Sequence, residues 1–236
     1  MKILIIRHAE PEFHTDRLTQ KGWREAERLS ERLSKIKIDA FFTSPMVRAR
    51  DTAQVTLERM NREAETLDWL HEFRGRVVNP KTGHPDCAWD FMPQYWTRCP
   101  EFSDFTGWTQ NPLIATGNSE EVYRETARGL DALLARYGYI KNGALYTTQK
   151  SSEATIALFC HFAISMNILS YLLRIPFHLL LHGFLTAPSS VTTLVSEERI
   201  PGEVWFRCIA LGDTSHLYAA DEPISQAGLY PEICHN

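Results

Sequence analysis

The sequence has few cysteines and no Cys-x-x-Cys spacing. Its five cysteines are an odd number, and one of them stands inside an apolar run: Cys87, Cys99, Cys160, Cys208 and Cys234. A disulfide framework would need a denser and more regular pattern. We therefore expect reduced and mostly buried thiols, which suit a cytoplasmic protein.

An excess of positive charge and long uninterrupted apolar runs are also missing. The formal net charge is −4, and no broad basic stripe is visible, which argues against a nucleic-acid partner. The most apolar segment, residues 156–186, is interrupted by residues such as Arg174 and Pro176, so a membrane span is not expected. The first six residues run at once into Arg7, which is too early for a signal peptide.

What is present is an ordinary globular composition. The 236 residues are 44% hydrophobic and 23% charged, which is enough for one large domain with its own core. We expect a single domain over residues 1–236. Within it, residues 73–118 form an aromatic-rich insertion that we interpret as a lid over the substrate. Ordinary core packing would explain the same aromatics: Trp89, Phe91, Tyr95, Trp96, Phe102, Phe105 and Trp108.

The pattern around this insertion is typical of alternating strands and helices. We expect strands at 2–6, 38–43, 67–70 and 155–160, and helices at about 20–35, 46–61, 120–137 and 163–173. Thr19, Ser44 and Ser119 stand where the first three helices would be capped, with Pro45 as a first helical residue. Residues 191–195 and 204–211 predict a hairpin, so at least one strand is antiparallel.

Three apolar runs end in residues that can hold or attack a phosphate group. Residues 3–6 lead into Arg7 and His8, residues 40–42 into Ser44 and Arg48, and residues 155–160 into His161. In an open α/β sheet, ligands bind just beyond the carboxyl ends of the strands. The sequence therefore predicts that two histidines and two arginines meet in one phosphate site.

These residue types fit a histidine nucleophile. Attack on phosphorus needs an unprotonated ring nitrogen, and free imidazole titrates near ~6.5. Arg7 and Arg48 would keep His8 neutral, because neighbouring positive charge disfavours its protonation. Their guanidinium forks and the amino end of the helix after Ser44 would hold the phosphoryl oxygens without a metal.

The leaving oxygen would need a general acid, and Glu72 is our candidate. It follows the expected strand at 67–70 and precedes a turn at Gly75. Enclosure under the lid would raise the pKa of this carboxyl by desolvation. Afterwards the carboxylate could activate water to split the phosphohistidine. Each of these residues taken singly has an ordinary structural explanation, and only their shared position at strand ends favours a site.

Four segments, in order, resemble the motifs of the histidine phosphatase superfamily, also called the phosphoglycerate mutase-like family. They are Arg7-His8-Ala9-Glu10, Leu18-Thr19-Gln20-Lys21-Gly22, Ser44-Pro45-Met46-Val47-Arg48-Ala49-Arg50-Asp51-Thr52-Ala53 and Gly117-Asn118-Ser119-Glu120. The resemblance implies an α/β fold, a three-layer α/β/α sandwich around a mostly parallel sheet with one antiparallel strand.

The resemblance also implies a role for each matched residue. His8 would be the phosphorylated nucleophile, Glu72 the proton donor, and Arg7, Arg48 and His161 the phosphate pocket, with His14 as a polar substrate contact. Ala9 and Phe162 stand where the family usually has glycine, and Glu72 precedes Gly75 by three residues where four is common. The alternative proton donors are Glu10, Glu12, Asp68 and Glu120.

Our first interpretation is a metal-independent phosphomonoesterase that acts through a phosphohistidine on a small phosphorylated metabolite. The loop from His8 to Leu18 is short and lacks the long substrate-gripping segment of the glycolytic mutases. A cofactor-dependent phosphoglycerate-type mutase and a catalytically weak phospho-ligand binding module are the alternatives. We expect no metal and no cofactor, because several histidines near one aspartate lack ligand spacing: His178, His182, His216 and His235, with Asp213.

Overall fold

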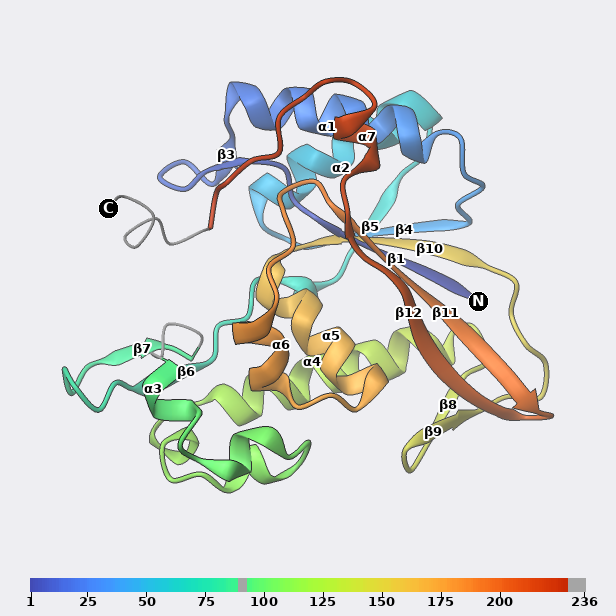
Figure 1. Cartoon of the computed structure of the whole chain (residues 1–236). Helices are drawn as coiled ribbons and strands as arrows, with labels where there is room; N and C mark the ends of the chain where they lie inside the picture. Colours follow the sequence, from blue (N-terminus) through green and yellow to red (C-terminus); the bar gives the residue numbers. More distant parts are fainter. Residues whose placement is uncertain (89–92, 229–236) are drawn as a thin grey trace.

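The computed structural model describes residues 1–88 and 93–228, which form an eight-stranded sheet between helices (Figure 1). The strand order is β5-β4-β10-β1-β11-β12-β9-β8. Parallel pairing joins β5 (Ala64–Thr66), β4 (Ala40–Thr43), β10 (Thr155–Cys160) and β1 (Lys2–Arg7). β11 (Val191–Ile200) runs antiparallel to β1. The expected α/β fold with a mostly parallel central sheet is confirmed.

Antiparallel hairpins extend and decorate this sheet. The expected hairpin is formed by β11 and β12 (Glu203–Asp213), and β9 (Leu145–Thr147) and β8 (Ile140–Asn142) follow it in the sheet. Two small hairpins lie outside the sheet. They pair β2 (Pro11–Glu12) with β3 (Arg17–Leu18), and β6 (Arg76–Val78) with β7 (Pro85–Cys87).

Helices cover both faces of the sheet. On one side lie α1 (Gln20–Leu33), α2 (Val47–Met60) and α7 (Ser215–Tyr218), and on the other α4 (Ser119–Ala135), α5 (Phe162–Leu173) and α6 (Phe177–Gly183) (Figure 1). Successive side chains of a strand point to opposite faces of the sheet, and the side chains of β1 are buried on both faces. Ile3 and Ile5 pack into one core cluster, and Leu4 and Ile6 into the other.

Of the three predicted N-cap residues, the structure confirms one and contradicts two. Thr19 caps α1 as expected, its hydroxyl accepting a hydrogen bond from the Gly22 amide at 3.0 Å. The expected cap at Ser44 is wrong, since α2 starts at Val47 and its N-cap residue is Met46. The N-cap of α4 is Asn118, and the Ser119 hydroxyl donates instead to the Arg76 carbonyl.

The expected strand at residues 67–70 is also wrong. The strand beside β4 is β5, and residues Asp68–Leu70 form a short 3-10 helix, η1. Leu70 is fully buried there, so an apolar run that was interpreted as a strand is a buried turn of helix. Short apolar runs do not distinguish these two structures by periodicity alone.

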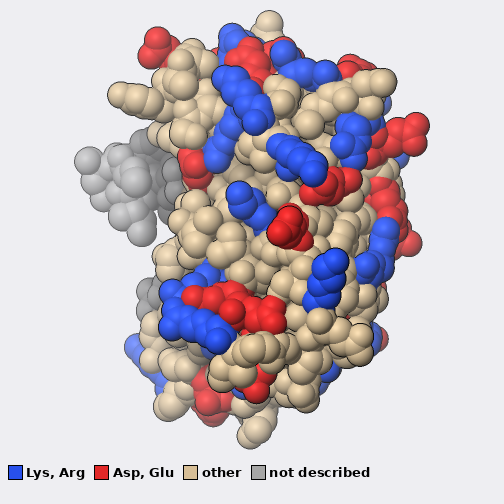
Figure 2. All heavy atoms as spheres, turned by 90° about the vertical axis from the view of Figure 1, so that its right-hand side faces the viewer, with Lys and Arg blue, Asp and Glu red and all other residues tan. Residues whose placement is uncertain are grey.

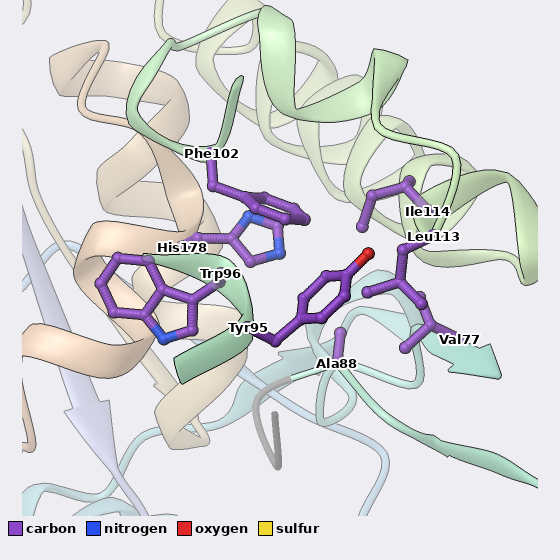
Figure 3. A pocket seen from close by; sticks show the side chains of 8 residues that line it. All are labelled: Val77, Ala88, Tyr95, Trp96, Phe102, Leu113, Ile114 and His178. Carbon is purple, nitrogen blue, oxygen red and sulfur yellow. The ribbon is translucent and has the colours of Figure 1, made fainter. Parts of the chain in front are cut away.

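Residues 76–118 pack against α6 rather than standing apart from the core. They contain α3 (Pro93–Trp96) and the 3-10 helices η2 (Pro100–Ser103), η3 (Gly107–Gln110) and η4 (Ile114–Thr116). Phe102 and Trp108 are buried against His178 of α6. Phe102 and His178, together with Tyr95 and Trp96, line a small apolar pocket (Figure 3). Trp89 and Phe91 lie outside the described residues. The lid itself stays a prediction.

The described cysteines and the surface fit the composition. Cys99, Cys160 and Cys208 are free, Cys87 accepts a hydrogen bond from Arg76, and Cys234 lies outside the described residues. On the face seen in Figure 2, basic and acidic side chains are interspersed rather than gathered by sign. Within residues 1–88 and 93–228, no helix has the length and apolarity needed to cross a bilayer.

Candidate active site

The carboxyl ends of three neighbouring strands bring the predicted residues together. His8 follows β1, Ser44 follows β4 and His161 follows β10, and these strands are adjacent in the sheet. Backbone hydrogen bonds continue the pairing past the strand ends, from the His8 amide to the Cys160 carbonyl and from the Ser44 amide to the Phe159 carbonyl. The His8 and His161 rings therefore lie with their centroids 5.1 Å apart.

His8 is held in one tautomer. Its Nδ1 lies 2.8 Å from the Ala9 carbonyl oxygen, which can only accept, so Nδ1 carries the hydrogen and Nε2 keeps a lone pair. The side chain is 2% exposed. Burial lowers the pKa of His8 well below its usual value, and Arg7 and Arg48 lower it further. The imidazole is neutral, as the sequence predicted, with burial as the largest cause.

Arg7 is a buried cation anchored to backbone carbonyls. Nη1 donates to the Thr186 carbonyl at 2.5 Å and Nη2 to the Ala227 carbonyl at 3.4 Å, and the guanidinium lies 5.8 Å from the centre of the Phe162 ring. Nε has no hydrogen-bond partner within the described part of the chain. Burial lowers the pKa of Arg7 to about 10, so the side chain is still a cation at neutral pH. A phosphoryl oxygen would supply the acceptor that Nε lacks.

Arg48 stands in the first turn of α2 and is 8% exposed. Its Nη1 donates to the carboxylate of Asp16, which lies in the turn between β2 and β3. The other carboxylate oxygen of Asp16 accepts from the Val47 amide at 2.8 Å. The amino end of α2 therefore binds a side chain of this protein, and Nε of Arg48 has no partner among the residues described.

His161 is the N-cap residue of α5 and is completely buried. The Ser44 hydroxyl accepts from the Met46 amide at 3.2 Å and lies 2.7 Å from Nε2 of His161. If the hydroxyl donates its own proton to Nε2, Nδ1 carries the hydrogen and can donate to a phosphoryl oxygen. Nδ1 has no partner within residues 1–88 and 93–228. Burial lowers the pKa of His161 well below its usual value, so this histidine is neutral too.

Glu72 lies close enough to this cluster to interact with the charges of Arg7 and Arg48. One of its oxygens accepts from the Phe73 amide at 2.8 Å and from the Ile164 amide, in the first turn of α5, at 3.1 Å. Burial raises the pKa of Glu72, and these two hydrogen bonds and the charges of Arg7 and Arg48 oppose that rise. A carboxyl whose pKa is raised in this way is a candidate for a general acid.

The other candidate carboxyl groups are placed elsewhere. Glu12 and Asp68 are exposed, and Glu120 pairs with Arg124 on the surface of α4. Glu10 accepts hydrogen bonds from the hydroxyls of Thr19 and Ser225. The structure therefore favours Glu72 over these alternatives by position.

No hydrogen bond or ion pair among the described residues joins His14 to His8, His161 or the two arginines. It lies exposed in the turn between β2 and β3, two residues before Asp16. The expected substrate contact at His14 stays a prediction.

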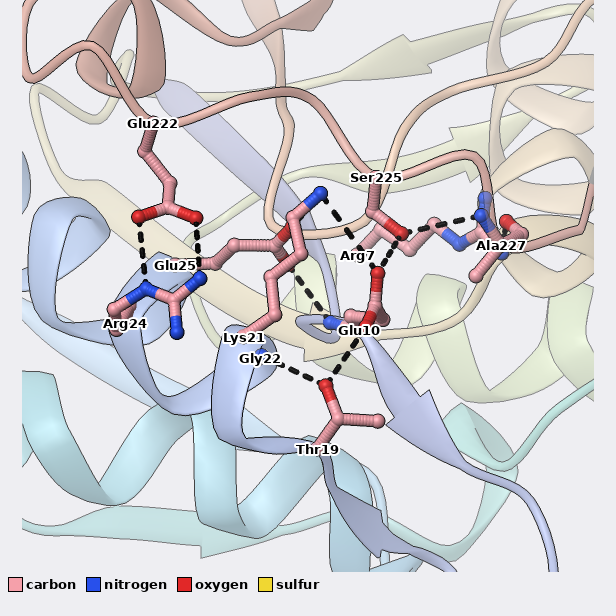
Figure 4. Close-up of polar contacts among 10 residues, drawn as sticks. All are labelled: Arg7, Glu10, Thr19, Lys21, Gly22, Arg24, Glu25, Glu222, Ser225 and Ala227. Atoms are coloured by element: carbon pink, nitrogen blue, oxygen red, sulfur yellow. Dashed lines mark hydrogen bonds and ion pairs between the residues drawn. The ribbon is translucent and has the colours of Figure 1, made fainter.

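A C-terminal segment that sequence reasoning missed lies against the Arg7 side of the site (Figure 4). The Ser225 hydroxyl donates to Glu10 at 2.6 Å, the Ala227 carbonyl accepts from Arg7, and Glu222 pairs with Arg24 of α1. Gly228 adopts φ +94°, and a Cβ there would lie 3.1 Å from Nη2 of Arg7. No local pattern marks this segment, because its partners are some 200 residues away in the sequence.

Comparison with known sequences decides the family. The sequence model of the histidine phosphatase superfamily (branch 1) matches residues 3–205. The chain belongs to this superfamily. A 2,3-bisphosphoglycerate-dependent phosphoglycerate mutase of Thermoplasma acidophilum is 36% identical over 98 residues, which cover 35% of this chain. That alignment spans about half, 49%, of the length of this curated relative.

Solved structures share the fold of this superfamily member. A phosphoserine phosphatase of Entamoeba histolytica, in complex with phosphoserine, superimposes with a TM-score of 0.63 at 20% identity and covers 92% of this chain and 98% of its own. A mycobacterial glucosyl-3-phosphoglycerate phosphatase has a TM-score of 0.61 at 17% identity, with 89% and 98% covered. Within the described residues, no three His, Cys, Asp or Glu side chains are grouped so that they could hold a metal ion.

Proposed function

We propose that the protein is a phosphomonoesterase that transfers the phosphoryl group of a small phosphorylated metabolite to Nε2 of His8 and then to water. The observation that carries this proposal is the hydrogen bond between Nδ1 of His8 and the Ala9 carbonyl, which aims the lone pair of Nε2 away from the backbone. Among the described residues, Nε of Arg7, Nε of Arg48 and Nδ1 of His161 have no hydrogen-bond partner, and the charges of both arginines act on His8. Three such donors would suit the three equatorial oxygens of a phosphoryl group in transfer.

The reaction follows from these positions. Nε2 of His8 bonds to phosphorus, the ester P–O bond breaks, and the carboxyl of Glu72 gives its proton to the leaving alkoxide. The Ala9 carbonyl stabilises the positive charge that develops on the ring, through the hydrogen on Nδ1. A water molecule then attacks phosphorus, Glu72 takes its proton, the N–P bond breaks and inorganic phosphate leaves. The arginines supply the positive charge throughout, so this scheme needs no metal.

The test is hydrolysis of p-nitrophenyl phosphate in EDTA by the wild-type protein and by His8→Ala. His84→Ala is the matched control, since His84 is an exposed histidine in the turn between β6 and β7. We expect activity in the wild type and the control, its loss in His8→Ala, and an acid-labile phosphoprotein that only variants with His8 form. Full activity of His8→Ala, or activity that EDTA abolishes, would refute the proposal.

A phosphoglycerate-type mutase is the second candidate, because a mutase is similar to part of this chain. A mutase must keep its phosphorylated product and reorient it, whereas the loop after His8 is only the short hairpin of β2 and β3. Interconversion of 2- and 3-phosphoglycerate, with and without a bisphosphorylated primer, separates the two. Primer-dependent interconversion that exceeds phosphate release would favour the mutase.

A further inference from the structure

One charged contact in the site has no role in the chemistry described so far. Asp16 projects from the turn between β2 and β3 and binds two consecutive residues of α2. One carboxylate oxygen accepts from the Val47 amide at 2.8 Å, and the other accepts from Nη1 of Arg48. The carboxylate is therefore both the cap of α2 and the partner of a site arginine.

This contact restrains a side chain that would otherwise be free to turn. Arginine has many rotamers, and a planar guanidinium binds phosphate well only when its fork is aligned with the oxygens. Asp16 is itself fixed by the Val47 amide, so Nη1 of Arg48 is held at a point set by the backbone of α2. Nε of Arg48 is buried and has no partner among the described residues, so it is available to a ligand.

We propose that Asp16 is a positioning residue, which fixes the guanidinium of Arg48 so that Nε and Nη2 are presented to the phosphoryl group before substrate binds. The inference rests on the proposed function, because it takes Arg48 to be a phosphate ligand. A carboxylate near an anion also has a cost, since its negative charge repels the phosphate. Positioning and repulsion predict opposite effects, which two substitutions can separate.

The backbone of Asp16 determines which substitutions are informative. Its φ is +56°, in the left-handed region, where alanine is strained and glycine or asparagine is tolerated. Asp16→Gly therefore removes the side chain without adding backbone strain. Asp16→Asn removes the negative charge and keeps one acceptor oxygen, which can serve Arg48 or the Val47 amide but not both, because each carboxylate oxygen of Asp16 accepts from one of them. Asp51→Ala is the matched control, because Asp51 joins the same two elements through Arg17 at 3.6 Å and does not touch Arg48.

The experiment measures KM and kcat for p-nitrophenyl phosphate, the inhibition constant of inorganic phosphate, and the unfolding midpoint of each variant. Loss of a hydrogen bond between two charged groups changes a binding constant by about tenfold. We expect Asp16→Gly to raise the phosphate inhibition constant and to lower kcat/KM about tenfold, with an unfolding midpoint lowered by the loss of the acceptor for the Val47 amide but well above the assay temperature. Asp16→Asn should lose less phosphate affinity than Asp16→Gly, because its one oxygen can still accept from Arg48, and Asp51→Ala should be unchanged.

Two results would overturn the inference. Phosphate binding by Asp16→Gly equal to that of the wild type would mean that Arg48 needs no partner. Tighter phosphate binding by both Asp16→Gly and Asp16→Asn would mean that the charge of Asp16 repels the ligand and that its placement of Arg48 does not matter. A wild-type protein that neither hydrolyses the ester nor binds phosphate would instead refute the proposed function, and this inference with it.

Discussion

Glu25 gives the sharpest prediction for stability. This residue of α1 lies behind the His8 motif and is 0% exposed. One carboxylate oxygen accepts from the Glu10 amide at 2.8 Å, and the other lies 3.8 Å from Nζ of Lys21. Burial outweighs these contacts and raises the pKa of Glu25 from 4.5 to about 7.

The sign of the effect follows from proton uptake. Between pH 4.5 and 7 the folded protein holds a proton on Glu25 that the unfolded chain has lost, so this residue makes the protein less stable as pH rises. The difference between the two pKa values is about 2.5, which at about 1.4 kcal/mol each amounts to roughly 3 kcal/mol. Glu25→Gln removes this cost and should raise the free energy of unfolding by up to about 3 kcal/mol at pH 8 and by nothing at pH 4.

Urea denaturation from pH 4 to 8 measures the difference between the variant and the wild type. Taking this difference removes the titration of all other groups, provided that the two m-values agree. At pH 8 the gain should raise the thermal midpoint by roughly 6–12 °C for a chain of this size. Glu31→Gln, at a half-exposed position of the same helix, is the matched control. A Glu25→Gln difference that is flat with pH, or that shows destabilisation at pH 8, would refute this account of Glu25.

Three further predictions concern other buried groups. Ser225→Ala loses a 2.6 Å hydrogen bond to Glu10 and should cost about 1.5–3 kcal/mol in urea denaturation, against no measurable cost for the exposed Ser34→Ala. Glu72→Gln should slow the phosphorylation of His8 by an alkyl phosphate by about 10²–10⁴ but should leave the first-turnover release of nitrophenolate from p-nitrophenyl phosphate little changed, because nitrophenolate leaves without a proton; equal losses in this single-turnover step would contradict the role of proton donor. Burial lowers the pKa of His178 to about 3, so the stability that its neutral form contributes is lost as pH falls from 6.5 to 3, and His178→Gln should flatten acid unfolding over that interval.

The cluster at the strand ends could be predicted because it depends on few rules. Apolar runs that are buried on both faces identify parallel strands, and the carboxyl ends of adjacent parallel strands meet at one edge. Arg7, His8 and His161 follow such runs directly, so their meeting required only the correct order of β1 and β10. Glu72 was predicted as the general acid because it follows an expected strand, and that strand is a 3-10 helix. The premise of this prediction was therefore wrong.

The contacts that orient these residues could not be predicted, because they join distant parts of the chain. Asp16 and Arg48 are 32 residues apart, and Ser225 and Glu10 are 215 apart. Ser44 shows how such contacts override a local signal. Its sequence is that of a helix cap, but its hydroxyl lies 2.7 Å from His161 and Asp16 accepts from the first amide of α2 instead. The sequence rule for helix capping considers only donors and acceptors within a few residues of the helix start. It cannot include a hydrogen-bond partner from a distant part of the chain.

Both arginines of the site are therefore held by acceptors from outside the motifs that contain them. Arg7 is bound by the Thr186 and Ala227 carbonyls, and Arg48 by Asp16. Each arginine binds the protein through at least one Nη atom, and its Nε has no partner among the described residues, so in the proposed function phosphate would bind without the entropy cost of ordering two long side chains. Neutral carbonyls on Arg7 leave its charge intact, whereas Asp16 offsets that of Arg48. A protonated Glu72 then leaves the pocket net positive, and an ionised Glu72 would cancel this remainder. In the proposed function, the rise in the pKa of Glu72 through burial would favour both the binding of an anionic substrate and the donation of its proton.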